Sequence, residues 1–161
     1  VLTKLAAVCV EHDLLVLSDE VYENLIFDAT HTAVASLPGM WERTVTVSSA
    51  AKSWNVTGWK TGWALAPAPL LDAVVTAKQF MSYVGATPFQ PAVAHALNHE
   101  QEWLRGMVAE LATGRDILVA GLREAGLQVH DTSGTYFVVA DIGESGDGLQ
   151  FCLDLPERIY S

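Results

Sequence analysis

Cysteine, basic residues and long apolar runs are scarce in this sequence. Cys9 and Cys152 are its only cysteines, and their separation suits neither a metal site nor a disulfide framework. Nine basic residues stand against nineteen acidic ones, which gives a formal net charge of −10. Such an exterior repels nucleic-acid phosphates and anionic lipid surfaces. We therefore expect a cytoplasmic protein that binds no nucleic acid and no membrane.

Signals for export are also missing. The first residues contain no initiating methionine and no basic start followed by an apolar run. No apolar stretch reaches the length of about 20 residues that spans a bilayer. Hydrophobic residues make up 50% of the chain, which is enough for a buried core. The sequence predicts a globular chain whose start is internal, as in a fragment of a longer protein.

Three short strands are predicted in the first half of the chain. The apolar run 14–17 ends in the polar residues 18–20, as a buried parallel strand with polar groups at its carboxyl end does. Residues 44–49 are rich in β-branched side chains, and residues 62–66 form a third apolar run that prolines close. Ligands of α/β proteins lie at the carboxyl ends of such strands, so the polar residues there are candidates for a site.

Helices are expected around these strands, followed by a second, smaller α+β unit. Thr3 is placed to cap a first helix over about 4–12. Further helical patterns cover 69–79, 88–99 and about 101–125. After the long helix, two strands at 127–130 and 135–140 are joined by a turn at 131–134, and residues 143–148 form a loop.

Histidines do not indicate a metal site. His95 and His99 lie four residues apart on a predicted helix with Glu100 beside them, but no third ligand follows at a suitable spacing. A solvated helix face explains them better. The remaining histidines stand in polar contexts and are interpreted as surface or loop residues: His12, His31 and His130. We expect no bound metal.

Two lysines flank a glycine-containing loop between the second and third predicted strands. Lys52 and Lys60 lie eight residues apart, among tryptophans and small residues. A solvated loop would explain either lysine alone, whereas bulky aromatic residues beside small ones favour a shaped cavity. A lysine amine in such a cavity can form an imine with an aldehyde and can transfer protons. The loop is therefore the strongest candidate for a reactive site.

These residues carry a family resemblance. Ser-x-x-Lys at 49–52, followed by Thr-Gly-Trp-Lys-x-Gly-Trp at 57–63, resembles the cofactor-lysine signature of class I and II aminotransferases, which are pyridoxal-phosphate-dependent transferases of fold type I. The run 18–23 is similar to the strand-end motif of the same family. The resemblance covers essentially the whole chain. It is strongest to the branch that contains kynurenine aminotransferases and N-succinyldiaminopimelate aminotransferases.

The resemblance implies a role for each candidate residue. Lys52 would form the Schiff base with pyridoxal 5'-phosphate and later act as a base. Asp19 would pair with the pyridine nitrogen and keep it protonated, while Tyr22 would hydrogen-bond to the phenolic oxygen of the ring. Ser49 and Lys60 would bind the phosphate, one through its hydroxyl and the other through its charge.

The implied fold is α/β and partial. Residues 1–98 would form the second half of the large cofactor-binding domain, which has a mixed or parallel sheet. Residues 99–161 would form part of the small α+β domain, including the long interdomain helix. The family's amino-terminal elements are not found here, so the chain resembles a carboxyl-proximal fragment. The full-length parent would be a homodimer.

Several activities share these motifs. The first is an enzyme that transfers an amino group from an amino acid such as glutamate to a 2-oxo acid, for which N-succinyl-2-amino-6-oxopimelate of lysine biosynthesis is one candidate. The alternatives within the family are a kynurenine or aromatic aminotransferase and a cysteine-conjugate β-lyase. A non-catalytic truncated remnant is the alternative outside it. Fold alone does not choose among them.

Overall fold

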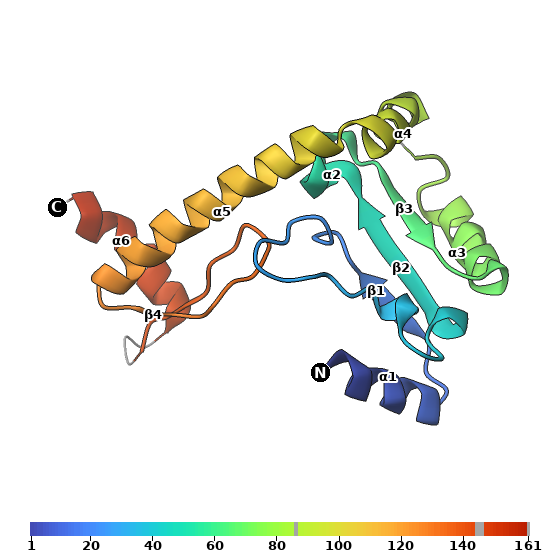
Figure 1. The fold of residues 1–161 in the computed structure, drawn as a ribbon, viewed down its shortest axis with the longest axis horizontal. Helices are drawn as coiled ribbons and strands as arrows, with labels where there is room; N and C mark the ends of the chain where they lie inside the picture. The colour runs from blue at the N-terminus through green and yellow to red at the C-terminus, as the bar shows by residue number, and fades with distance from the viewer. Residues whose placement is uncertain (86, 144–146, 161) are drawn as a thin grey trace.

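The computed structural model describes residues 1–85, 87–143 and 147–160, and its first half contains a mixed three-stranded sheet (Figure 1). β1 (Val16–Asp19) pairs in parallel with β2 (Thr44–Ser49), and β2 pairs antiparallel with β3 (Gly62–Leu65). β2 therefore lies in the middle. The strands predicted at 44–49 and 62–66 are confirmed, and the second strand ends one residue earlier than predicted.

The expectation of a buried strand at 14–17 is wrong for this chain. The strand begins only at Val16, and Leu15 and Leu17 are 72% and 73% exposed. The cause is that Val16 packs against the core formed by Ala6, Cys9 and Met40, whereas the alternating side chains of Leu15 and Leu17 lie on the opposite side, where they remain exposed. The polar carboxyl end of β1, however, lies where the sequence places it.

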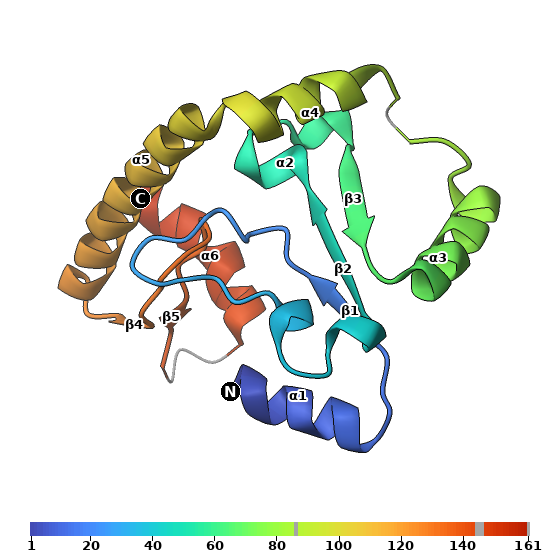
Figure 2. The ribbon, with the colours of Figure 1, turned by 45° about the vertical axis from the view of Figure 1, so that its right-hand side comes forward.

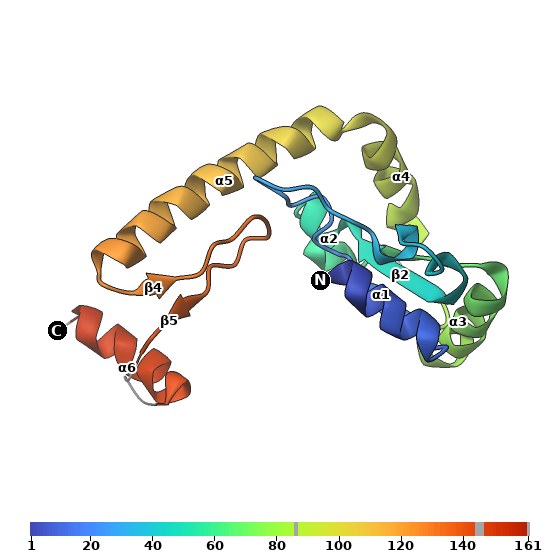
Figure 3. The ribbon, with the colours of Figure 1, turned by 60° about the horizontal axis from the view of Figure 1, so that its bottom comes forward.

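A first apolar core lies between the sheet and α1 (Leu2–Glu11), which runs alongside the sheet (Figure 3). It consists of the buried side chains of Ala6, Cys9 and Met40. Thr3 does not cap this helix, contrary to our expectation. The helix starts earlier, because the carbonyl oxygen of Val1 already accepts the backbone N–H groups of residues 4 and 5.

Short and long helices link the sheet to the rest of the chain. The helices predicted at 69–79, 88–99 and 101–125 are confirmed with bounds shifted by one or two residues. Figures 1 and 2 show that the longest helix, α5, leaves the neighbourhood of α2 and α4 and runs toward the carboxyl-terminal elements. None of the described helices is long and apolar enough to cross a membrane. In chain order, these segments are η1 (Val34–Ser36), η2 (Trp41–Arg43), α2 (Ala50–Ser53), η3 (Thr57–Trp59), α3 (Ala68–Met81), η4 (Thr87–Phe89), α4 (Gln90–His99) and α5 (Gln101–Glu124).

The carboxyl-terminal part contains two very short strands and a last helix. β4 (Gln128–Val129) and β5 (Ala140–Asp141) pair antiparallel, and α6 (Gly148–Tyr160) follows. The predicted loop 143–148 ends one residue early, because Gly148 begins α6, and its residues 144–146 lie outside the described part of the chain. The pattern of the sequence did not indicate α6.

The strand predicted at 135–140 is largely absent, and only its last residue, Ala140, belongs to β5, because the start of the segment bonds to another part of the chain. Backbone groups of residues 133–135 hydrogen-bond to residues 25–27 instead of continuing the hairpin. Phe27 N–H donates to the carbonyl of Ser133 at 2.8 Å, and Thr135 N–H donates to the carbonyl of Leu25 at 2.7 Å. Gly134 faces Ile26 in an isolated antiparallel bridge. We refer to residues 133–135 with residues 25–27 as the backbone clasp.

A second apolar core lies under the backbone clasp. Leu25 is fully buried and packs with Leu104 and Met107 of α5, while Tyr22 and Trp54 pack around them. The core joins the segment after β1 to the long helix, so it fixes the segment that carries Tyr22. The division of the chain into partial domains at 1–98 and 99–161, which falls at the end of α4, stays a prediction.

Candidate active site

Three strand ends meet at one edge of the sheet. Asp19 ends β1 and stands opposite Val47 of β2, two residues before Ser49. Because the two strands are parallel, their carboxyl ends lie at the same edge. Gly62 begins the antiparallel β3 opposite Ser49, so Lys60, two residues earlier, reaches that edge as well. The topology thus brings Asp19, Ser49 and Lys60 to a common edge, where the sequence predicts a ligand.

Lys52 is held at this edge by the short helix α2. Ser49 caps the helix, since its hydroxyl accepts the N–H of Ala51 at 3.2 Å. The N–H of Ala50 donates to the carbonyl of Thr61 at 3.0 Å, which ties the start of the helix to the residue before β3. Lys52 is half-buried. A serine cap and one backbone bond therefore place the lysine between the ends of β2 and β3.

The amine of Lys52 lies against two tyrosine rings. Its Nζ is 6.0 Å from the centroid of the Tyr22 ring and 5.3 Å from that of Tyr136. Tyr22 donates its hydroxyl hydrogen to the hydroxyl oxygen of Tyr136 at 3.2 Å, and the two rings meet edge to face with centroids 5.5 Å apart. The Lys52 amine thus stands beside both phenols, at distances at which a ring attracts a cation.

This arrangement changes the acidity of both phenols. The bond to Tyr136, followed by burial and by the charges of Tyr136 and Asp19, raises the pKa of Tyr22 to about 12. The Lys52 amine, followed by the Tyr22 hydroxyl, lowers the pKa of Tyr136. Tyr22 therefore keeps its hydroxyl hydrogen near neutral pH and can donate it in a hydrogen bond. Tyr136 is the more acidic of the two phenols.

Asp19 lies close enough to influence Tyr22 by its charge and is itself exposed. One of its carboxylate oxygens accepts the N–H of Val21 at 3.2 Å. It lines a cavity of about 340 Å³ with Glu20 and His31. An exposed carboxylate beside a cavity can pair with a cationic group of a ligand.

Glu20, the next residue, is buried and hydrogen-bonded. Its carboxylate lies 2.7 Å from His31 Nε2 and accepts the Val34 N–H and the Ser18 hydroxyl, each at 3.0 Å. Burial raises the pKa of this carboxyl, but the bonds from these three groups outweigh burial and the pKa is lowered. His31 is thus no isolated loop residue, as we first interpreted it. It fixes the residue beside Asp19.

No metal is assigned to the histidines or acidic residues. Ligand atoms of Glu20, Glu23 and His31 lie within 4.8 Å of one another. These atoms already have partners, because the Ser48 hydroxyl donates to Glu23 at 2.7 Å and Glu20 accepts the hydrogen bonds described above. On α4, His95 Nε2 lies 3.5 Å from Glu100 on an exposed face. The expectation that no metal is bound stays a prediction.

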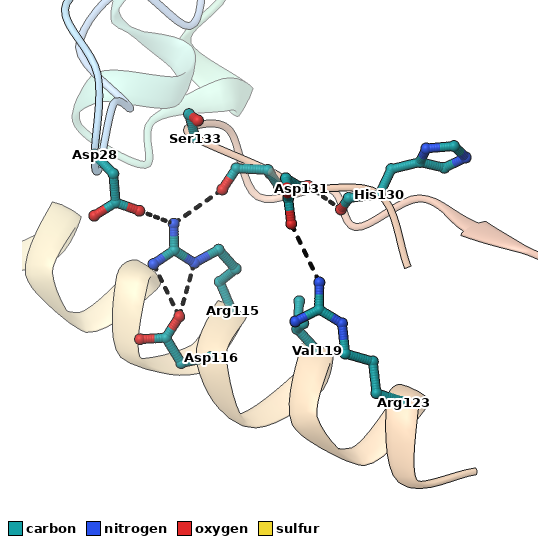
Figure 4. Close-up of a pocket in the computed structure, with 9 residues that line it drawn as sticks. Asp28, Arg115, Asp116, Val119, Arg123, His130, Asp131 and Ser133 are labelled. Carbon is teal, nitrogen blue, oxygen red and sulfur yellow. Dashed lines mark hydrogen bonds and ion pairs between the residues drawn. The ribbon is translucent and has the colours of Figure 1, made fainter. Parts of the chain in front are cut away.

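A second cavity of about 340 Å³ lies away from the lysine and is lined by charged residues (Figure 4). Arg115 of α5 pairs there with Asp28 and Asp116, and it donates to the carbonyl of Thr132 at 2.9 Å. Its guanidinium also lies 4.8 Å from the ring centroid of Phe27. These charged and polar groups of the cavity are thus paired with one another. They join α5 to the segments that contain Asp28 and Thr132. None of the five predicted site residues lines it.

Tyr136 is a neighbour of Lys52 that the sequence did not indicate. It lies 114 residues after Tyr22, and its segment was expected to be an ordinary strand. No local pattern signals such a contact, because the backbone clasp creates it. The Gly134 that precedes it is the one local hint, since a β-carbon there would meet the carbonyl oxygen of Leu25 at 2.5 Å.

The donor set fits the cofactor implied by the sequence. Lys52 supplies an amine for an aldehyde, Asp19 a carboxylate for a protonated ring nitrogen, and Tyr22 a phenol that remains a donor. Ser49 and Lys60 offer a hydroxyl and a positive charge near the strand ends for a phosphate. In the strongly acidic chain, this local pair of lysines favours an anionic ligand.

Comparisons with known proteins agree with these observations. The family model described as aminotransferase class I and II matches residues 1–160. A probable N-succinyldiaminopimelate aminotransferase of Mycobacterium tuberculosis is 51% identical over 161 residues, and the match covers 98% of this chain and 41% of the relative. Kynurenine–oxoglutarate transaminase 3 of Mus musculus is 41% identical over 153 residues, with 90% and 34% covered.

A solved structure shows the same similarity in three dimensions. The N-succinyldiaminopimelate aminotransferase from Mycobacterium tuberculosis superposes with a TM-score of 0.93 at 51% identity. The match covers 97% of this chain and 41% of that structure. The chain therefore spans less than half the length of the proteins it resembles.

Proposed function

The chain belongs to the class I and II aminotransferases, a pyridoxal-phosphate-dependent family of fold type I, and on this premise we propose that Lys52 is its cofactor-binding lysine. The observation that carries the proposal is the convergence on Lys52 of groups from distant parts of the chain. Its Nζ lies within 6.0 Å of the Tyr22 ring centroid, and the charge of Asp19 acts on the same tyrosine.

Each residue has a distinct task in the proposed site. Lys52 binds the cofactor through its amine and, when free, holds or moves a proton at Nζ. Tyr22 would turn its single hydroxyl hydrogen from Tyr136 to the ring oxygen of the bound cofactor, and Asp19 would hold the proton on the ring nitrogen. Ser49 and Lys60 bind the phosphate at the strand ends. When bound, the cofactor supplies an electron sink for the substrate carbon that loses a proton.

We further propose that the longer protein transfers an amino group from a donor such as glutamate to a 2-oxo acid. The 51% identity to a probable N-succinyldiaminopimelate aminotransferase favours N-succinyl-2-amino-6-oxopimelate as acceptor and a role in lysine biosynthesis. The 41% identity to a kynurenine–oxoglutarate transaminase favours a kynurenine or aromatic aminotransferase as the alternative. Assays of the longer protein with N-succinyl-2-amino-6-oxopimelate as amino acceptor, and with kynurenine as amino donor, distinguish the two.

A cytoplasmic homodimer is our proposal for the longer protein. An apolar surface at the end of α3 and just beyond it supports the dimer, because Phe80 and Met81 are each 86% exposed and Tyr83 and Val84 are 68% and 63% exposed. Exposed apolar patches of this kind mark protein interfaces. The measurement is the mass of the longer protein in solution.

The test of the cofactor lysine is a titration of the purified chain with pyridoxal phosphate, followed by borohydride reduction and peptide mapping. We expect one reducible adduct, confined to Lys52 and lost in Lys52→Ala. Lys78→Ala is the matched control, since Lys78 lies on the exposed side of α3. Adducts scattered over surface lysines, or none, would overturn the proposal and leave a chain that does not organise the cofactor by itself.

A further inference from the structure

The position of the Tyr136 hydroxyl extends the proposed site. Tyr136 comes from the segment that closes the backbone clasp, far from the strands that supply the other residues. Its hydroxyl accepts the hydrogen bond of Tyr22, and its ring lies 5.3 Å from Lys52 Nζ, closer than the Tyr22 ring. The second half of the chain thus contributes a residue that meets the amine.

Local structure holds Tyr136 in this place. Thr135 adopts a left-handed backbone with φ of 65° and donates its N–H to Leu25. The Thr135 hydroxyl oxygen accepts the N–H of Phe137 at 3.1 Å, so the backbone is fixed on both sides of Tyr136. The Phe137 ring packs edge to face on Tyr22 at 5.9 Å. A left-handed non-glycine residue is uncommon and persists only where its surroundings fix it.

We propose that Tyr136 is a positioning residue of the site, which holds the Lys52 amine beside Tyr22 through its hydroxyl and ring. The inference rests on the proposed function of Lys52. A hydroxyl that accepts from Tyr22 keeps one lone pair for the amine. Its ring attracts the amine in the charged form. The Lys52 amine is thus kept beside the hydroxyl group of Tyr22.

The charged groups around Tyr136 come from several elements. Lys52 of α2 faces it on one side, together with Tyr22 after β1 and Asp19, which acts on Tyr22. On the other side, Glu110 and Arg115 of α5 line a cavity of about 170 Å³ with Tyr136. Lys52 is the largest influence and lowers the pKa of the Tyr136 phenol. The amine and the phenol are therefore electrostatically linked.

The first arm of the test uses the chain without cofactor. Tyrosines labelled with 13C at the ring carbon that bears oxygen are titrated by NMR, and Tyr136→Phe assigns the signal. We expect Tyr136 to lose its proton at lower pH than Tyr22 and to titrate at higher pH in Lys52→Met. A Tyr136 titration that Lys52→Met leaves unchanged would overturn the proposal, whatever the cofactor does.

The second arm uses the adduct with pyridoxal phosphate. Tyr136→Phe keeps the ring and removes the hydroxyl, so the fold is expected to remain, which circular dichroism checks. The midpoint pH of the adduct's absorbance change should fall by about 0.5 to 1 unit, the size expected for a lost hydrogen bond at a half-exposed site. Tyr83→Phe removes a hydroxyl from a ring outside this cluster and should leave the midpoint in place.

The two arms separate the two proposals. If the unaltered chain forms no adduct at Lys52, the proposed function fails, while the first arm still judges the contact between Tyr136 and Lys52. If the adduct forms and Tyr136→Phe behaves like Tyr83→Phe, the positioning role is wrong and the cofactor lysine stands.

Discussion

The guanidinium of Arg115 on α5 hydrogen-bonds to the carboxylate of Asp28, 87 residues earlier in the chain. The same group donates to the carbonyl of Thr132 (Figure 4). One side chain therefore joins the long helix to both segments of the backbone clasp, because Asp28 follows residue 27 and Thr132 precedes residue 133. A planar guanidinium can make these bonds at once, and a lysine amine cannot reproduce their geometry.

Replacement of Arg115 should loosen this junction. We expect Arg115→Lys to lower the thermal midpoint of unfolding and to speed amide exchange at the N–H groups of Phe27 and Thr135. Arg123→Ala is the control, because Arg123 is 53% exposed and pairs with an Asp131 that is 96% exposed, and exposed pairs contribute little. Equal effects of both substitutions, measured by calorimetry and hydrogen exchange, would contradict the role of Arg115.

Gly134→Ala should destabilise the chain by about 1–3 kcal/mol, a usual cost of overpacking. The added carbon would meet the Leu25 carbonyl oxygen at 2.5 Å and Ile26 Cδ1 at 3.0 Å, so the backbone clasp must shift. Gly106→Ala is the matched control, since nothing lies within 4 Å of its added carbon and it sits in α5. A helix gains about 0.5–1 kcal/mol from that change. Urea unfolding measures the free energy of unfolding of both variants. If Gly134→Ala leaves that free energy unchanged, the backbone clasp has room for a β-carbon at residue 134.

Acid should weaken the fold partly through Glu20. Its pKa is lowered in the folded state, so its contribution is present above the unfolded value, about 4.3, and is lost as pH falls through the folded pKa. Glu20→Gln should therefore be less stable than the parent near neutral pH and lose less stability on acidification. The measurement is the free energy of unfolding across the acid range.

Glu42→Gln, at an exposed position of η2, is the control for that series. It should follow the parent curve. If Glu20→Gln also follows the parent curve at every pH, the bonds of Glu20 to His31, Val34 and Ser18 do not stabilise the fold in the way that the structure indicates.

The sequence predicts those parts of the fold that depend on local patterns. The consecutive β-branched residues 44–47 produce most of β2 because such side chains favour strands, and polar residues after a strand mark the end of the sheet where ligands bind. The common placement of Asp19, Ser49 and Lys60 follows from these strand ends. Their position could therefore be predicted before any distance was known.

The remainder depends on partners far away in the chain. Residues 133–135 have the composition of a hairpin, yet their hydrogen bonds go to residues 25–27, and no pattern within either segment specifies the other. The contact of Tyr136 with Tyr22 and Lys52 follows from that pairing. The bond between Glu20 and His31 depends likewise on the course of a loop.

The backbone clasp also sets an order of events during synthesis. Residues 25–27 leave the ribosome more than one hundred residues before the segment that binds them, as the separation of 114 between Tyr22 and Tyr136 shows. At about 5–20 residues per second, the wait is roughly 5 to 20 s. Leu25, fully buried in the finished fold, lacks its partners Leu104 and Met107 until that part of α5 has been synthesised, which is before residues 133–135 appear. The second apolar core therefore forms in two steps, first when α5 reaches Leu25 and then when the backbone clasp closes over it.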